Sequence, residues 1–293
     1  MNRPNFFIIG APKCGTTSMA AWLAAHPQIY MSPIKEPHFF NNDHQHGEID
    51  NLADYNQQFA NATEEQKAIG EASVWYLTST VAVANILQFN PDAKFIVMLR
   101  NPIEMAESLH DQMLFSQYEH IEDFSQAWYL QEQRKSGFSI VKSCVEPQFL
   151  QYGERCKLGE QLQRLYTLVA PERVHVITMD RLKIAAKEEY QKTLQFLHVA
   201  DDGRNDFSVH NLAKSRRSLP LRKVVEWLGG LKTAMGISGG LGILNAIEKK
   251  NQKVRKRPPL PPQTKEHLQN YFRDDIHLLE KLLNRDFSHW LKP

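Results

Sequence analysis

A glycine-punctuated loop directly after an apolar run carries the residues best suited to chemistry in this 293-residue chain. Residues 6–9 are Phe-Phe-Ile-Ile, typical of a buried strand, and a helical pattern begins at about residue 16. The loop between them reads Gly10-Ala11-Pro12-Lys13-Cys14-Gly15, followed by Thr16 and Thr17. The first turn of a helix leaves backbone N–H groups without partners and carries the positive end of the helix dipole. With a lysine and two hydroxyls beside it, the loop predicts a phosphate cradle.

The order of residues in this loop differs from that of a nucleoside-triphosphatase P-loop, G-x-x-x-x-G-K-[ST], in which lysine follows the second glycine and the next hydroxyl holds Mg2+. Here Lys13 precedes Gly15 by two residues, and Thr16 stands at the position of that lysine. The register therefore disfavours a site for ATP and Mg2+ and indicates another phosphate ligand.

A second candidate anion contact follows the apolar run at residues 94–99. That run ends in Arg100-Asn101-Pro102, and the helical pattern after it places Ser108 eight residues beyond Arg100. An arginine at the end of a strand and a serine about two turns into the next helix can converge on one phosphate. Taken alone, the pair better fits an ordinary surface arginine and a solvent-facing serine.

Together these segments resemble sulfotransferases that use 3'-phosphoadenylyl sulfate (PAPS). The string Pro12-Lys13-Cys14-Gly15-Thr16-Thr17 resembles their 5'-phosphosulfate loop, and Arg100 with Ser108 resembles their 3'-phosphate element. The segment at residues 33–40, Pro-Ile-Lys-Glu-Pro-His-Phe-Phe, is similar to heparan-type and related bacterial members, in which the glutamate is the general base. The resemblance therefore assigns this role to Glu36, and His38 would assist or replace it. Without the resemblance, Glu36 would better fit an exposed loop acid paired with Lys35.

Two positions depart from the pattern of the family. Met105 replaces a second arginine of the 3'-phosphate element, and Asn41 replaces an acidic residue that follows the two phenylalanines. Arg216 and Arg217, in the string Lys214-Ser215-Arg216-Arg217, are candidates to supply the missing cation. The segment at residues 70–76, Gly-Glu-Ala-Ser-Val-Trp-Tyr, resembles a strand and loop that line the acceptor pocket, which predicts substrate contacts from Glu71, Ser73 and Tyr76.

The resemblance implies transfer of a sulfuryl group from PAPS to a hydroxyl or amine, with adenosine 3',5'-bisphosphate as the product and no metal. Lys13 and the loop amides would stabilise charge on the leaving phosphate oxygen, and Glu36 would accept the proton of the acceptor. The acceptor is not identified by any motif. The modest charge and an apolar, glycine-rich segment at residues 229–242 favour a small molecule or an apolar acyl acceptor.

Apolar runs at residues 6–9, 94–99 and 174–178 alternate with helical periodicity. This pattern predicts an α/β fold with a P-loop-like, mainly parallel central sheet and helices on both faces. Apolar stripes predict helices over residues 16–25, 158–169, 190–197 and 264–283. We expect one sulfotransferase domain over residues 1–293, with a flexible glycine-rich and basic segment at about residues 229–262.

Composition excludes several partners. The net charge is +2, from 35 basic and 33 acidic residues, which gives no chain-wide basic surface for nucleic acid. No stretch of about 18 apolar residues predicts membrane insertion. Three cysteines without C-x-x-C spacing (Cys14, Cys144, Cys156) and the lack of a leader-like start favour reduced thiols in a cytoplasmic protein. Nothing in the sequence indicates an oligomeric state.

Two other classes of function stay open. The first is a P-loop nucleotide kinase or NTPase, because the apolar run at residues 174–178 is followed by Asp180, similar to a strand end that holds a metal. The second is a non-catalytic binding protein that retains a nucleotide fold and uses its glycine-rich and basic segments as a contact surface. The shifted Lys13 argues against the first, and the presence of both Lys13 and Glu36 argues against the second.

Overall fold

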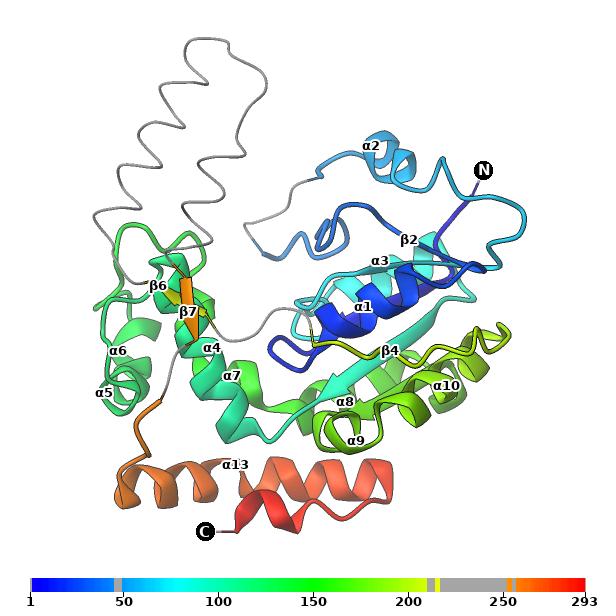
Figure 1. The fold of residues 1–293 in the computed structure, drawn as a ribbon. Helices are drawn as coiled ribbons and strands as arrows, with labels where there is room; N and C mark the ends of the chain where they lie inside the picture. Colours follow the sequence, from blue (N-terminus) through cyan, green and yellow to red (C-terminus); the bar gives the residue numbers. More distant parts are fainter. Residues whose placement is uncertain (1, 45–48, 210–213, 217–251, 255–256, 293) are drawn as a thin grey trace.

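The computed structural model describes residues 2–44, 49–209, 214–216, 252–254 and 257–292. Five parallel strands form its central sheet in the order β2-β3-β1-β4-β5 (Figure 1). Their bounds are Phe6–Gly10 for β1, Ile29–Met31 for β2, Ala68–Ala72 for β3, Lys94–Leu99 for β4 and Val174–Thr178 for β5. The predicted α/β class and parallel sheet are therefore confirmed, and every pairing in this sheet is parallel.

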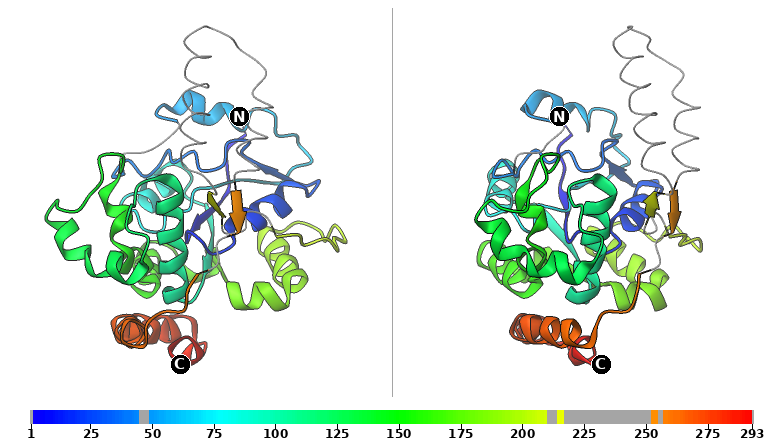
Figure 2. Two further views of the ribbon diagram at one scale, coloured as in Figure 1. Left: turned by 60° about the vertical axis from the view of Figure 1, so that its left-hand side comes forward. Right: turned by 90° about the vertical axis from the view of Figure 1, so that its left-hand side faces the viewer.

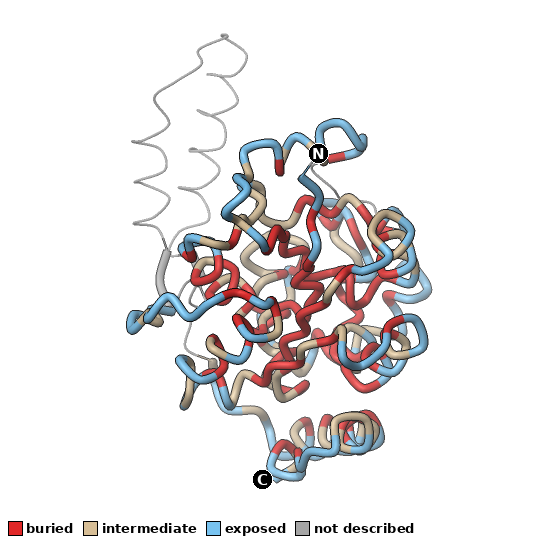
Figure 3. Tube along the Cα trace, turned by 90° about the vertical axis from the view of Figure 1, so that its right-hand side faces the viewer, coloured by how far each residue is buried: buried red, intermediate tan, exposed pale blue. Residues whose placement is uncertain are grey.

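The central strands are buried along almost their whole length. Residues 6–9 of β1 and 95–99 of β4 have no exposed surface, and Figure 3 shows buried residues concentrated along the strands in the middle of the molecule. A parallel strand covered on both faces must be apolar on both sides, so it reads as a continuous apolar run rather than an alternating one. This is why these strands could be predicted from runs of apolar residues in the sequence.

Helices cover both faces of the sheet (Figures 1 and 2). The helices α1 (Thr16–Ala24) and α10 (Ala186–Leu197) lie on one face, and α3 (Ala82–Phe89) and α8 (Leu158–Leu168) lie on the other. The long helix α13 (Pro262–Leu283) packs against α8. The remaining helices are α2 (Leu52–Gln57), α4 (Pro102–Ser116), α5 (Phe124–Tyr129), α6 (Gln131–Lys135), α7 (Tyr152–Cys156) and α9 (Met179–Ile184).

The strand order places the ends of β1 and β4 side by side. After β1 the chain builds β2 and β3 on one side, and it then crosses to build β4 and β5 on the other. Loops at the carboxyl ends of strands on either side of such a reversal are the usual ligand-binding position of an open α/β sheet. The loop after β1 and the loop after β4 are those that contain Lys13 and Arg100.

A second, two-stranded antiparallel sheet lies against α4, outside the central sheet (Figure 1). It pairs β6 (Lys214–Arg216) with β7 (Gln252–Val254). The glycine-rich segment at residues 229–242 lies outside the described residues, as does much of the basic segment at residues 249–257. In the part of the chain that is described, no helix combines the length and apolarity needed to cross a bilayer.

Candidate active site

Backbone geometry shapes the loop between β1 and α1. Gly15 has a φ of +86°, and a Cβ atom there would lie 3.1 Å from Met179 Sδ, so both conformation and space favour glycine. The amide of Ala11 donates to the carbonyl of Met98 at 2.8 Å, which attaches the loop to β4. Because α1 begins without a side-chain cap, its first turn presents N–H groups and the hydroxyls of Thr16 and Thr17 toward a cavity.

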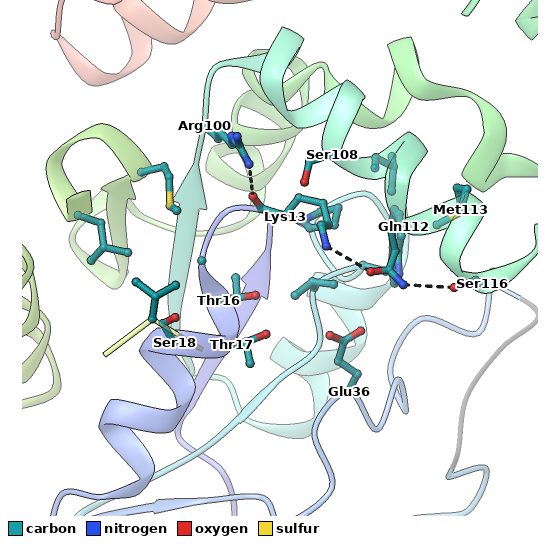
Figure 4. A pocket seen from close by; sticks show the side chains of 18 of the residues that line it. Lys13, Thr16, Thr17, Ser18, Glu36, Arg100, Ser108, Gln112, Met113 and Ser116 are labelled. Carbon is teal, nitrogen blue, oxygen red and sulfur yellow. Dashed lines mark hydrogen bonds between the residues drawn. The ribbon is translucent and has the colours of Figure 1, made fainter. Parts of the chain in front are cut away.

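The cavity has a volume of about 940 Å3 and opens at the carboxyl ends of β1 and β4. Figure 4 shows Arg100 and Ser108 on one side of Lys13 and Glu36 on the other. Most of the residues predicted from the sequence line this cavity, namely Pro12, Lys13, Gly15, Thr16, Thr17, Glu36, His38, Arg100 and Ser108. The structure therefore brings together predicted residues from three separate segments, residues 12–17, 36–38 and 100–108, around one space.

Lys13 extends across the cavity toward α4. Its Nζ atom donates to Gln112 Oε1 at 3.2 Å, and Gln112 Nε2 donates to Ser116 Oγ at 3.2 Å (Figure 4). Burial lowers the pKa of Lys13; the charge of Asp111 opposes this effect, while Arg100 and Arg257 add to it. A bound anion would relieve the crowding of positive charge around this ammonium group.

Arg100 is held against the loop between β1 and α1. Its Nη1 atom donates to the carbonyl of Lys13 at 3.2 Å, and its Nε and Nη2 atoms donate to Glu104 Oε2 at 3.0 and 2.8 Å. Ser108 lies on the buried face of α4 and lines the same cavity. The helix starts where it does because Pro102 occupies its first turn and the side chain of Asn101 caps the amide of Ile103.

Arg257 is a cavity residue that sequence reasoning placed only within a basic segment. It lines the cavity, and its Nε atom lies 2.6 Å from Asp111 Oδ2, three residues after Ser108 on α4. Met105, which stands where a second arginine was expected, is fully buried beside Cys14 Sγ, with the two sulfur atoms 3.9 Å apart. Of the expected suppliers of that cation, Arg216 is described only as backbone of β6, and Arg217 lies outside the described residues.

Glu36 and His38 form a hydrogen-bonded pair on the segment after β2. His38 Nε2 lies 3.2 Å from Glu36 Oε2, and Lys35 Nζ is paired with the other carboxylate oxygen. Burial alone would raise the pKa of Glu36, but the hydrogen bond from His38 and the charge of Lys35 outweigh it and bring the pKa to about 2. The side chain of Glu36 is therefore ionised at neutral pH, and it lines the cavity.

Glu71, Ser73 and Tyr76 do not line the cavity, in contrast to the expectation that they contact the acceptor. All three side chains have no exposed surface. Glu71 accepts hydrogen bonds from both other residues and from Tyr55, so the group forms a buried network behind the wall. The wall itself is formed by the intervening Val74 and Trp75, because the chain turns after β3 and directs these two side chains outward.

Cys14 also faces the interior. Its side chain has no exposed surface, and Sγ donates to the carbonyl of Pro12 at 3.4 Å. Burial raises the pKa of the thiol to about 12. Cys14 is buried as a whole residue and, unlike its neighbours Lys13 and Gly15, does not line the cavity.

Two apolar walls of the cavity were not predicted. Beside α1, the rings of Trp22 and Phe207 meet edge to face at 5.1 Å, and Trp22 Nε1 donates to the carbonyl of Ser208. Beyond the end of α4, Trp75 and Phe149 stack at 4.3 Å next to Tyr118. These five residues come from segments far apart in the chain, and only the helical spacing of Trp22 relative to Ser18 could have indicated its position.

Asp180, the residue that suggested a metal-holding strand end, lies at the start of α9 and does not line the cavity. Trp290 Nε1 lies 2.6 Å from Asp180 Oδ2, and His289 Nε2 lies 3.1 Å from the same oxygen. The carboxylate of Asp180 thus forms hydrogen bonds with side chains of the carboxyl-terminal segment. Among the described residues, no group of three or more His, Cys, Asp or Glu side chains is arranged to hold a metal ion.

Comparisons with known proteins identify the family of this chain. The sequence profile of the family described as "Sulfotransferase domain" matches residues 3–280. The chain is 28% identical to mouse "Carbohydrate sulfotransferase 15" over 248 residues, which is 67% of this chain and 44% of that protein. It is 25% identical to mouse "Bifunctional heparan sulfate N-deacetylase/N-sulfotransferase 3" over 307 residues, which is 99% of this chain and 31% of that protein. The chain therefore spans less than half the length of these curated relatives.

A solved sulfotransferase from Alicyclobacillus acidocaldarius is 25% identical, with a TM-score of 0.75, and the alignment covers 100% of both chains. The family predicted from the loop, strand and helix motifs is confirmed, and the kinase alternative is not favoured. This chain belongs to the sulfotransferase domain family.

Proposed function

We propose that this chain transfers a sulfuryl group from PAPS to the hydroxyl or amine of a small, apolar acceptor. The observation that carries the proposal is a single cavity with two cationic positions and one carboxylate. Lys13, with the first turn of α1, forms one cationic position. Arg100, Ser108 and Arg257 surround the other.

The described residues fit a doubly phosphorylated adenosine. The uncapped start of α1 and Lys13 would bind the 5'-phosphosulfate, and Arg100, Ser108 and Arg257 would bind the 3'-phosphate. The recess of Trp22 and Phe207 offers an aromatic surface for the base. Arg257 would thus supply the cation that Met105 does not, in a position that we expected of Arg216 or Arg217.

In the proposed reaction, the bond between sulfur and the bridging phosphate oxygen breaks while a bond forms from the acceptor oxygen or nitrogen to sulfur. Negative charge develops on the leaving phosphate oxygen, where Lys13 and the amides of residues 15–17 would stabilise it. The acceptor proton passes to Glu36. Because the pKa of Glu36 is about 2, the carboxylate is ionised before the reaction but is a weak base, so it would accept the proton only as the new bond to sulfur makes that proton acidic. His38 is placed to assist through its hydrogen bond to Glu36.

The acceptor side of the cavity supports an apolar substrate. Its apolar wall, at and beyond the carboxyl-terminal end of α4, includes Trp75, Met113, Tyr118, Val145 and Phe149. Among the described residues that line the cavity, the Lys and Arg side chains are Lys13, Arg100, Lys183 and Arg257, which come from the loop after β1, the end of β4, α9 and the segment before α13. A long acidic glycan would need cations on the aromatic wall as well. We therefore favour a small, uncharged hydroxyl or amine compound.

The cytoplasm is the proposed location, supported by three buried free thiols at Cys14, Cys144 and Cys156. A single domain over residues 1–293 remains a prediction, as does the flexible segment at about residues 229–262.

Binding and turnover test the proposal separately. Calorimetry should detect binding of adenosine 3',5'-bisphosphate in the absence of Mg2+. ATP should bind more weakly than this ligand, with or without Mg2+. Radiolabelled PAPS should then be offered with phenols, apolar alcohols, amines, and neutral and acidic glycans, since the names of two relatives refer to carbohydrate and heparan sulfate. Tight Mg2+-dependent binding of ATP alone would refute the donor assignment, and labelled product seen only with acidic glycans would refute the acceptor class.

A further inference from the structure

We propose that Glu71 is a positioning residue for the segment that carries the base, residues 36–40, and that it acts through the hydroxyls of Ser73 and Tyr76. The inference rests on the proposed function, because it concerns the geometry of Glu36 as a proton acceptor. It gives the buried network behind the cavity wall a role distinct from contact with the acceptor.

The first step is the environment of the carboxylate. Glu71 lies on β3 with no exposed surface. Ser73 Oγ donates to its Oε2 atom at 2.8 Å, and the hydroxyls of Tyr55 and Tyr76 donate to its Oε1 atom at 2.9 and 3.0 Å. Burial raises the pKa of Glu71, and the three hydroxyl donors oppose that rise. A buried carboxylate with three donors fixes the direction in which each of those hydroxyl protons points.

The second step is what the same hydroxyls do with their remaining lone pairs. Ser73 Oγ accepts a hydrogen bond from the amide of His38 at 3.2 Å. The hydroxyl of Tyr76 accepts one from the amide of Phe40 at 3.3 Å. Each hydroxyl has a single proton, so donation to Glu71 leaves only acceptor capacity for the amide. Glu71 thereby sets the polarity of two contacts that hold the segment.

The third step is that this segment needs to be held. Glu36 and His38 have φ values of +65° and +52°, in the left-handed region that residues other than glycine rarely adopt. The amide of Glu36 is also bound to β3, by donation to the carbonyl of Ala72 at 2.9 Å. A shift of the amides at positions 38 and 40 would move His38 Nε2 away from Glu36 Oε2 and turn the carboxylate away from the acceptor.

The chain offers a matched pair of variants for the test. Tyr55 and Tyr76 both have no exposed surface, and both donate to Glu71 Oε1, but only Tyr76 also accepts from an amide of the segment. Tyr76→Phe and Ser73→Ala should each lower kcat by about 10- to 100-fold, whereas Tyr55→Phe should stay within about twofold of the wild type. Binding of adenosine 3',5'-bisphosphate should be unchanged in all three variants.

Glu71→Gln adds a second line of evidence, because an amide nitrogen donates and must reverse one of the hydroxyls. It should also lower kcat with little effect on nucleotide binding. Equal losses of kcat in Tyr55→Phe and Tyr76→Phe, or unchanged kcat in Tyr76→Phe, Ser73→Ala and Glu71→Gln together, would overturn the proposal.

Hydrogen exchange provides a readout that does not depend on turnover. In Tyr76→Phe the amide of Phe40, and in Ser73→Ala the amide of His38, should exchange faster than in the wild type, while Tyr55→Phe should leave both protected. If wild-type protein transfers no sulfuryl group from PAPS, the proposed function fails, but this exchange pattern still tests whether the hydroxyls of Ser73 and Tyr76 hold the segment. Unchanged protection of both amides in Tyr76→Phe and Ser73→Ala would refute this positioning role.

Discussion

Arg257 and Asp111, 146 residues apart in the sequence, form an ion pair with Nε 2.6 Å from Oδ2. The pair joins the segment before α13 to the cavity side of α4. Asp111 lies one helical turn after Ser108 on α4, so the ion pair holds the Arg257 guanidinium group on the side of the cavity that Ser108 lines. The proposed site needs a second cation for the 3'-phosphate at this position.

Arg257→Ala should weaken binding of adenosine 3',5'-bisphosphate by about 10- to 100-fold, the usual effect of losing a charge-assisted hydrogen bond. The affinity for adenosine 5'-phosphosulfate, which lacks the 3'-phosphate, should hardly change. Calorimetry with both ligands measures the difference. Arg273→Ala serves as the control, because Arg273 is an exposed residue of α13 that bonds to Asn270. Equal losses for the two ligands would show that Arg257 does not contact the 3'-phosphate.

Glu36→Gln and Glu36→Ala should each lower kcat by about 100-fold or more, since the positioned proton acceptor is removed. Nucleotide affinity should be retained, and Glu132→Gln on the exposed surface should be neutral. In the wild type, the carboxylate of Glu36 is ionised above its pKa of about 2. Activity that depends on this ionised form should therefore fall only as pH drops through that value. An acid limb of kcat near pH 5 that moves in Glu36→Asp would contradict this assignment.

Lys13 should couple nucleotide binding to proton uptake at alkaline pH. Burial lowers the pKa of Lys13 below the ordinary 10.5, and a bound polyanion favours the ammonium form. As pH rises through the pKa of Lys13 in the free protein, the affinity for the nucleotide should fall, and nucleotide binding should be accompanied by uptake of a proton. Calorimetry in buffers with different ionisation enthalpies measures this uptake.

Lys13→Arg is the matched variant, because its guanidinium stays charged and should flatten the pH dependence of binding. Lys13→Ala should nearly abolish transfer at every pH while the fold is kept. Identical alkaline profiles in the wild type and Lys13→Arg would show that another group is responsible for the coupling.

His175 should make stability depend on pH. It lies on β5, where its ring stacks on Phe196 and bonds to Thr193, and burial lowers its pKa from 6.5 to about 4. Between these values the unfolded chain binds more protons than the folded one, so the free energy of unfolding rises with pH, by at most about 3 kcal/mol. Partial exposure of the ring reduces this value.

Urea unfolding from about pH 4 to about pH 7 checks this expectation. His175→Gln should lose much of the pH slope, whereas His120→Gln, at an exposed position, should keep it. The same slope in the wild type and His175→Gln would assign the effect to other groups.

The fold and the conformation of the loop between β1 and α1 were predictable because both depend on local sequence patterns. The runs at residues 94–99 and 174–178 match β4 and β5 in full, since buried parallel strands are apolar on both sides. Lys13, Thr16 and Thr17 owe their positions to one strand, one turn and one helix start. By contrast, β2 is only three residues long, too short for its pattern to stand out.

The residues that were missed depend on contacts between distant segments. Trp22 meets Phe207, and Trp75 meets Phe149, only because the helices and strands between them pack as they do. Ser73 and Tyr76 were expected to line the cavity but lie behind its wall, because the alternation of the strand ends at Ala72 and no local period indicates which of the following side chains turns inward. The sequence indicated that Arg257 belongs to a basic segment, but it did not indicate that this segment reaches the cavity.

The inward orientation of Cys14 has a practical consequence. A cysteine inside a nucleotide loop would ordinarily make an enzyme sensitive to alkylating reagents and peroxide. Here the thiol has no exposed surface and a pKa of about 12, so almost none of the reactive anion exists at neutral pH. Iodoacetamide and mild oxidants should therefore leave the nucleotide loop unmodified, and preparations should keep their binding capacity without added reductant.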